Sequence, residues 1–175
     1  MSLVSPPLPR NGFQYALSAG LLAGVLSVLQ SIALTLLNVG TFQQASREIA
    51  AITRPSDNTA LALAGIGALT LLISLLICAI AGYIVGKLAV QRRLGFLAGA
   101  LAGAITYIGA FAVHYIPNYP GNMVAGSSGT GGAIVISAIM LSIVFLLIWA
   151  VVGGLLGLLG AWLATRRHPF YMTSK

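Results

Sequence analysis

Four long apolar segments separated by short polar ones dominate the chain. They cover residues 12–38, 60–86, 94–116 and 133–164, and no Asp, Glu, Lys or Arg interrupts any of them. A helix rises about 1.5 Å per residue, so each segment is long enough to cross the roughly 30 Å hydrocarbon core of a bilayer. The pattern therefore predicts four transmembrane helices.

The length of these segments also selects the fold class. Only helices and closed barrels satisfy their backbone hydrogen bonds in lipid, and the segments are too long and continuous for barrel strands. We predict an all-α integral membrane protein with four transmembrane helices in a compact bundle, and residues 1–175 as a single membrane domain. The first apolar stretch is longer than the roughly 7 to 15 residues of a signal-peptide core, so we expect it to be retained as a span.

The two outer connections differ in pattern. In residues 41–53 the apolar positions Phe42, Ala45 and Ile49 recur at steps of three and four, which predicts a short amphipathic helix on the outer membrane surface. A docking surface for a partner is the alternative. Residues 117–132 are rich in Pro, Asn, Gly and Ser, which predicts turns followed by a flexible outer loop.

Composition agrees with a bilayer environment, because 58% of the residues are hydrophobic and 6% are charged, against about 25% charged in a typical soluble domain. The net charge of +7 gathers on one side of the predicted membrane. The basic residues of that side are Arg10, Lys87, Arg92, Arg93, Arg166, Arg167 and Lys175. By the positive-inside rule this side is cytoplasmic and holds both termini.

The same charge distribution indicates location and partners. We expect a multi-pass protein of the cell membrane, with a bacterial inner membrane as the favoured setting. Arg92, Arg93, Arg166 and Arg167 adjoin span ends, so anionic lipid headgroups are their expected partners, together with other integral membrane subunits for the chain as a whole. A nucleic-acid partner is not expected.

Small residues spaced by four form one face on each predicted helix. In lipid little hydrophobic force draws helices together, so close backbone approach through small residues is a main source of association. We predict that the helices pack tightly through these faces in the cytoplasmic half of the membrane and splay toward the outside. The predicted packing positions are Gly20, Gly24, Gly82, Gly86, Gly95, Gly99, Gly103, Gly153 and Gly157.

The two halves of the chain resemble each other in pattern. Residues 19–26 (AGLLAGVL) align with residues 98–105 (AGALAGAI), and the second and fourth spans both end in spaced glycines followed by paired arginines. We interpret this as two similar helical hairpins that share one orientation in the membrane.

Polar residues continue two of these faces toward the outer side, at steps of three or four residues. The candidate ligand- or cofactor-binding residues are Ser27, Ser31 and Thr35 in the first span and Thr106, Tyr107 and His114 in the third. They predict a hydroxyl-lined cavity above the glycine contacts. The alternative is that the hydroxyls bond their own helix backbone and only permit packing.

His114 is the most distinctive of these candidates. A histidine in a span can ligate the metal of haem or chlorophyll, carry protons, or bond a neighbour. Because it lies three residues before Pro117, near the outer interface, we favour an interfacial or packing role. No cofactor and no metal site is predicted, and haem or chlorophyll through His114 is kept as an alternative.

Catalytic chemistry has little support in this sequence. Paired carboxylates, a Cys/His pair and metal-ligand clusters are missing, and the one cysteine, Cys78, lies within the second span as a packing residue. We therefore expect a protein that is not an enzyme. Proton-coupled transport normally needs a carboxylate or histidine relay inside the membrane, which is also missing.

Two functions of different classes follow. The first is a noncatalytic membrane subunit, an accessory protein that packs onto a larger membrane assembly and stabilises it. The second is a small homo-oligomeric channel, carrier, or lipid- or pigment-binding protein that uses the polar outer half of the bundle.

Overall fold

The structure is a computed structural model that describes residues 11–51, 56–117, 119–123 and 132–166. Its helices are α1 (Gly12–Leu37), α2 (Val39–Ala50), α3 (Asp57–Ala89), α4 (Arg92–Val113), the short 3-10 helix η1 (Pro120–Met123) and α5 (Gly132–Thr165). The described segments contain no strand. Four of the helices, α1, α3, α4 and α5, are long and apolar enough to cross a membrane. The prediction of an all-helical fold with four helices long and apolar enough to span a membrane is confirmed for the described residues, and these helices indicate a multi-pass membrane protein.

The ends of the long helices follow from local chemistry. Ser56 caps α3, because its hydroxyl accepts a hydrogen bond from the Thr59 amide at 3.3 Å, so the helix begins at Asp57 rather than at residue 60. Val90 ends α3 in the left-handed region with φ 53°, and only Val90 and Gln91 separate α3 from α4. This tight connection places the two helices antiparallel.

The outer connections were predicted in part. The predicted amphipathic segment 41–53 forms α2, which is shifted toward the N-terminus and ends at Ala50. The predicted flexible loop 117–132 contains η1, while residues 124–131 lie outside the described part of the chain. Sequence reasoning missed η1 because Pro and Gly signalled turns without indicating that they wind into a helix.

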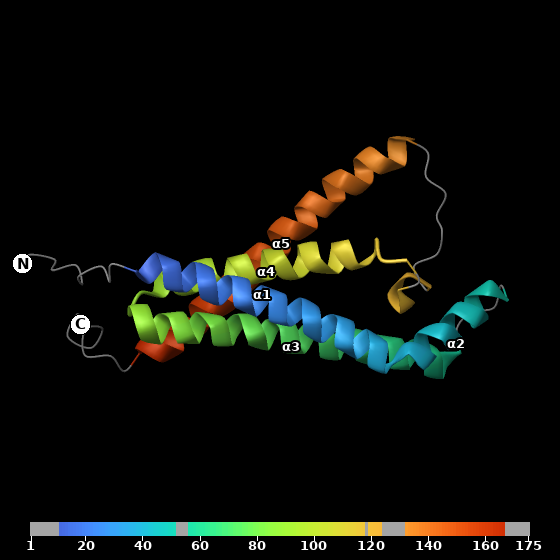
Figure 1. Ribbon diagram of the computed structural model, residues 1–175, viewed down its shortest axis with the longest axis horizontal. Coiled ribbons are helices and arrows are strands. Elements are labelled where there is room, and N and C mark those ends of the chain that lie inside the picture. Colours follow the sequence, from blue (N-terminus) through green and yellow to red (C-terminus); the bar gives the residue numbers. More distant parts are fainter. Residues whose placement is uncertain (1–10, 52–55, 118, 124–131, 167–175) are drawn as a thin grey trace, which may run out of the picture.

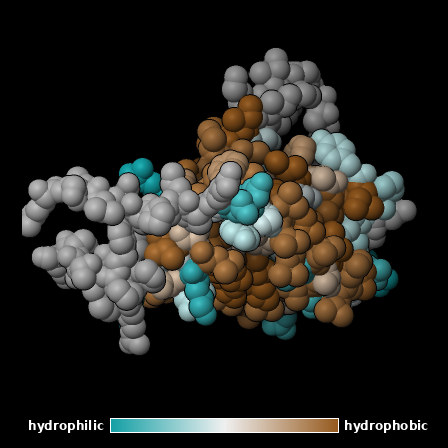
Figure 2. Space-filling model, turned by 60° about the vertical axis from the view of Figure 1, so that its left-hand side comes forward, coloured by the Kyte–Doolittle hydropathy of each residue, from teal (hydrophilic) through white to brown (hydrophobic). Residues whose placement is uncertain are grey.

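The long helices run along one another between two ends (Figure 1). The start of α1, the α3–α4 connection and the end of α5 lie at one end, which carries Lys87, Arg92, Arg93 and Arg166 and is called the basic end. The opposite end carries α2 and η1 and is called the α2 end. Toward the α2 end, α5 departs from the other helices. Apolar side chains cover much of the surface, as expected for helices in lipid (Figure 2).

Glycines lie where α3, α4 and α5 approach one another. A Cβ on Gly99 would overlap the carbonyl oxygen of Gly153, and a Cβ on Gly82 would overlap that of Gly157. A Cβ on Gly103 would overlap the Trp149 carbonyl oxygen. These contacts join backbone to backbone, so no rotamer change can make room for a side chain. The same holds for Gly153 and Gly157, while Gly86 and Gly95 both lie against Ala161.

The contact between α1 and α4 uses small residues as well. A Cβ on Gly20 would lie 2.7 Å from the carbonyl oxygen of Ala98, and one on Gly24 would lie 2.6 Å from Cβ of Ile105. The buried side chains around these contacts are mainly alanines, with Val85 and Cys78 among the largest that are fully buried. Backbone proximity, rather than bulky side chains, fills this part of the molecule.

The aligned glycines of the two halves do not make equivalent contacts. Gly20 and Gly24 of α1 face α4, whereas their counterparts Gly99 and Gly103 of α4 face α5. The two halves therefore share a glycine pattern, but the aligned glycines pack against different helices.

Three of the four predicted headgroup arginines, Arg92, Arg93 and Arg166, lie at the basic end. Arg92 is half-buried, and its Nε donates to the Thr165 hydroxyl at 3.1 Å, which ties the start of α4 to the end of α5. Arg93 and Arg166 are exposed, and Arg167 lies outside the described residues. Arg92 thus has a structural hydrogen bond that the sequence did not indicate.

Replacing Gly99 with alanine tests the role of backbone contact. We expect Gly99→Ala to lower the unfolding free energy by about 1–3 kcal/mol, because α4 and α5 must move apart. Gly65→Ala is the matched control, since a Cβ there meets nothing within 4 Å. Denaturant titration of both variants in the same detergent checks this, and equal unfolding midpoints would contradict it.

Candidate ligand-binding site

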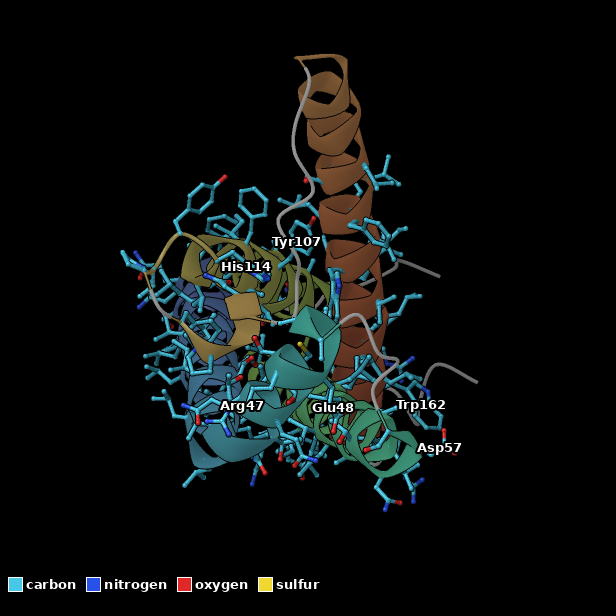
Figure 3. All side chains as sticks on the ribbon, turned by 90° about the vertical axis from the view of Figure 1, so that its right-hand side faces the viewer. Arg47, Glu48, Asp57, Tyr107, His114 and Trp162 are labelled. Atoms are coloured by element: carbon cyan, nitrogen blue, oxygen red, sulfur yellow. The ribbon has the colours of Figure 1, made fainter. Side chains whose placement is uncertain are left out.

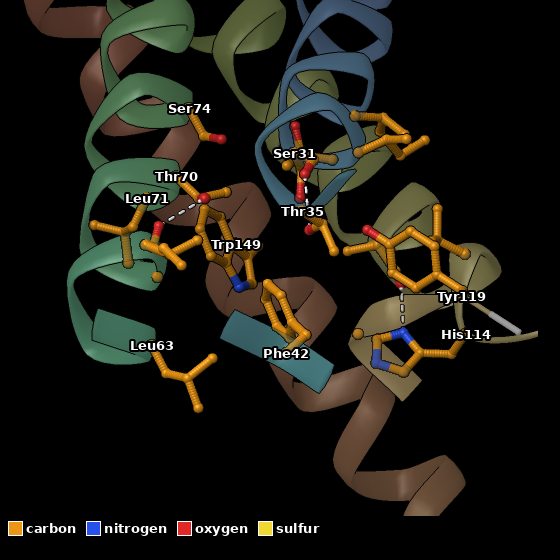
Figure 4. Close-up of a pocket in the computed structure, with 18 residues that line it drawn as sticks. Ser31, Thr35, Phe42, Leu63, Thr70, Leu71, Ser74, His114, Tyr119 and Trp149 are labelled. Carbon is orange, nitrogen blue, oxygen red and sulfur yellow. Dashed lines mark hydrogen bonds between the residues drawn. The ribbon is translucent and has the colours of Figure 1, made fainter. Parts of the chain in front are cut away.

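A cavity of about 600 Å³ lies toward the α2 end, between α1, α3, α4 and α5 (Figure 4). Its volume falls within the roughly 300–1,000 Å³ of small-molecule sites. Most of its lining is apolar. The polar lining residues are Ser31 and Thr35 of α1, Thr70 and Ser74 of α3, and Thr106 of α4 with His114 at its end. Three aromatic residues, Phe42, Tyr119 and Trp149, complete it from α2, the segment before η1, and α5.

Three threonines from three helices share one hydrogen-bond pattern. Thr35 donates to the Ser31 carbonyl at 3.0 Å, Thr70 to that of Ile66 at 2.8 Å, and Thr106 to that of Ala102 at 2.8 Å. Each hydroxyl proton is therefore bound to the preceding turn of its own helix. The oxygen lone pairs that remain are hydrogen-bond acceptors.

His114 repeats this pattern with an imidazole. Its Nδ1 lies 2.7 Å from the Ala110 carbonyl oxygen (Figure 4), and because a carbonyl only accepts, Nδ1 carries the proton. In a neutral ring Nε2 is then an acceptor as well. The ring borders a smaller neighbouring hollow too, of about 420 Å³, together with Tyr107 and Phe111.

Two segments cover the cavity at the α2 end. α2 contributes Phe42 and contacts both α3 and η1. η1 is held to the end of α4 because the Asn122 amide donates to the carbonyl oxygens of His114 at 2.8 Å and Ile116 at 3.2 Å. The bond to His114 also satisfies the carbonyl of the residue that caps the end of α4.

A hydrogen-bond cluster around Glu48 fastens α2 to the start of α3. The Glu48 carboxylate accepts from the Ser56 amide at 2.8 Å, from Gln44 at 3.1 Å and from the Thr59 hydroxyl at 3.1 Å. These donors, the Ser56 amide first, outweigh desolvation and lower the pKa of Glu48 from its ordinary value of 4.5. Figure 3 shows Glu48 on α2, at the same end of the molecule as Asp57.

The structure brings some of the predicted site residues together and separates others. Ser31, Thr35, Thr106 and His114 all line the large cavity. Tyr107 borders only the smaller hollow. Ser27 is fully buried and lines neither.

Sequence reasoning missed the contribution of α3 and of the aromatic residues. Thr70 and Ser74 are spaced by four, like the residues that were recognised, so the signal was present. Ser74 also donates to Oε1 of Gln30 at 3.4 Å, which links α3 to α1. No repeated spacing marked the aromatic lining residues, because each comes from a different segment: Phe42, Tyr119 and Trp149.

The lining limits what the cavity can do. The lining residues that the structure describes include no Asp, Glu, Lys or Arg. Among the described residues, no three His, Cys, Asp or Glu side chains are grouped to hold a metal ion. The arrangement suits an uncharged molecule that lies against apolar walls and hydrogen-bonds to a few oxygens or to Nε2 of His114.

Comparisons with known proteins found no similarity. No family model, no curated protein and no solved structure matches this chain.

Acid should loosen α2 through Glu48. Because its pKa is lowered, the ionised carboxylate stabilises the α2–α3 junction above the ordinary pKa, and this contribution is lost as pH falls through the lowered value. We expect hydrogen-exchange protection of α2 to fall in that range, after correction for intrinsic rates.

Two variants serve as controls for this prediction. Glu48→Gln should show weaker protection at neutral pH and lose the acid-dependent step, whereas Asp57→Asn should keep the step, since Asp57 is not one of the donors or acceptors in the cluster. An unchanged step in Glu48→Gln would contradict the assignment to Glu48.

Proposed function

We propose that this protein binds a membrane-soluble small molecule in the cavity at its α2 end, and that it does so without catalysing a reaction. The observation that carries this proposal is the convergence of acceptor side chains from three helices on one largely apolar cavity. Ligand sites typically combine an apolar lining with a few placed polar groups, and this lining has that character. A carrier or lipid-binding protein is the functional class.

The location of the cavity supports a ligand that comes from the bilayer. It lies between helices that would cross the membrane. A molecule that dissolves in the bilayer is therefore the ligand class that this location favours.

We place the basic end at the cytoplasmic face of a cell membrane, with both termini inside and the cavity in the outer half. The support is the positive-inside rule applied to Lys87, Arg92, Arg93 and Arg166, against Arg47, Glu48 and Asp57 at the α2 end (Figure 3). We propose a compact bundle of two similar hairpins, with Arg92, Arg93, Arg166 and Arg167 bordering anionic lipid headgroups. A bacterial inner membrane fits this arrangement.

A second candidate is the noncatalytic subunit of a larger membrane assembly. The observation that favours it is the departure of α5 from the other helices, together with the exposed apolar side chains of Leu141, Val144 and Phe145 on this helix. A transmembrane helix of another subunit can pack against such a surface by van der Waals contact.

Filling the cavity tests the ligand-binding function. Gly67 lines the cavity and a Cβ there meets nothing within 4 Å, so Gly67→Phe places a ring inside without a backbone clash. We expect small molecules that co-purify with the wild-type protein in mild detergent to fall by about tenfold in this variant, as a loss of about 1.4 kcal/mol of binding free energy implies. Mass spectrometry of extracts measures this.

Gly65→Phe is the matched control, because Gly65 is on the same helix, is equally open, and does not line the cavity. Equal co-purification in the two variants would contradict ligand binding in the cavity. Recovery of the wild-type protein only within a large complex of fixed composition would favour the subunit function instead.

Orientation is tested by labelling lysines. The chain has two lysines, Lys87 and Lys175, both predicted to be inside. A membrane-impermeant amine reagent should modify neither in intact cells and both after permeabilisation, as peptide mass mapping would show. Modification of Lys87 in intact cells would reverse the proposed orientation.

A further inference from the structure

We infer that the ligand of the α2-end cavity is a membrane-soluble alcohol, an uncharged apolar molecule whose hydroxyl group donates a hydrogen bond. This inference rests on the proposed binding function and specifies the chemical class of its ligand. It is carried by the direction of the hydrogen bonds already made by the cavity-lining side chains.

The hydroxyl protons of the lining threonines are already engaged in hydrogen bonds. Thr35, Thr70 and Thr106 each give their hydroxyl proton to a carbonyl of their own helix, at 2.8–3.0 Å. His114 does the same through Nδ1. The three threonine oxygens, and Nε2 of a neutral His114 ring, therefore present acceptors to the cavity, and a ligand gains hydrogen bonds from them only if it brings a donor. Ser31 also lines the cavity, and its hydroxyl can accept as well as donate.

The described lining residues carry no charged side chain that would pair with an ionic ligand. An anionic headgroup would meet these lone pairs without a cation to balance it, since the described residues of the lining include no Lys or Arg. A cationic headgroup would lack a carboxylate, because Glu48 is engaged by Ser56, Gln44 and Thr59 outside the cavity. Burying an unpaired charge in an apolar environment is costly, so both classes are disfavoured relative to a neutral donor.

The wall of the cavity is largely apolar, which favours an apolar body for the ligand. Apolar side chains from all four long helices, including Val28, Leu63, Val113 and Trp149, make up most of the wall. An alkyl or isoprenoid body suits this surface. The hydroxyl oxygen of an alcohol can also accept a hydrogen bond, for which the indole N–H of Trp149 is a donor.

A fluorescence experiment tests the class directly. The chain has two tryptophans, Trp149 in the cavity and Trp162, which is 44% exposed near the basic end. Trp162→Phe leaves Trp149 as the single reporter. Quenching is titrated in detergent micelles with four ω-bromo probes of equal chain length: dodecanol, dodecyl methyl ether, dodecanoate and dodecyltrimethylammonium.

We expect saturable quenching by the alcohol, with an affinity about tenfold above that of the ether, which cannot donate, and above those of both ions. Quenching in the Trp162→Phe, Gly67→Phe variant gives the background from probe that is only dissolved in the micelle. The comparison of alcohol with ether varies only the probe, so the acceptor side chains of the cavity stay as they are in the wild-type protein.

Variants of the acceptors give the second arm. Replacing Thr35, Thr70 and Thr106 together with valine keeps the side-chain shape and removes three acceptors, so the preference for alcohol over ether should fall severalfold. Thr41→Val, on α2 and outside the cavity lining, is the matched control and should keep the preference.

The outcomes separate the two proposals. Equal affinity for alcohol and ether, or tighter binding of the carboxylate or the ammonium probe, overturns the alcohol assignment and leaves ligand binding standing. No quenching above the Gly67→Phe background with any probe overturns the binding function itself.

Discussion

The structure depends on direct contact between helix backbones at glycine. Gly99 against Gly153, Gly82 against Gly157 and Gly103 against Trp149 leave no room for a Cβ. Moving an apolar side chain from lipid into a helix contact gains little free energy. Close backbone approach is therefore a main source of helix association in a membrane. The buried side chains of this region are correspondingly small, and alanine predominates among them. A β-carbon added at any of these positions would therefore displace the neighbouring helix as a whole.

This contact pattern also explains why a cavity exists. The glycine contacts of α5 run from Gly160 to Gly153 and reach Trp149, and beyond them the helix departs from its neighbours. Larger side chains, such as Leu63 and Ile66 of α3, border the space that opens there. Where the small residues end, helices separate, and the polar residues of three helices line the gap.

Helical periodicity predicted which side chains share a face of a helix. It did not predict how far along the helix the cavity begins, or which neighbouring helix each face meets. Steps of four placed Ser31, Thr35, Thr106 and His114 on the correct faces. The same steps included Ser27, which lies below the cavity in the close-packed region and is fully buried. Trp149 was not foreseen, since only the three-dimensional meeting of α5 with α4 brings it to the wall. Periodicity identifies a face of a helix but not what that face meets.

Trp149 belongs to both parts of the molecule. Its carbonyl oxygen is the surface that Gly103 approaches, and its indole forms part of the cavity wall. A displacement of α5 by even the width of a methyl group at Gly103 must carry the indole with it, because peptide and ring share one Cα. The distance between α4 and α5 and the shape of the cavity are consequently linked through a single residue. A substitution that changes this distance also changes the cavity.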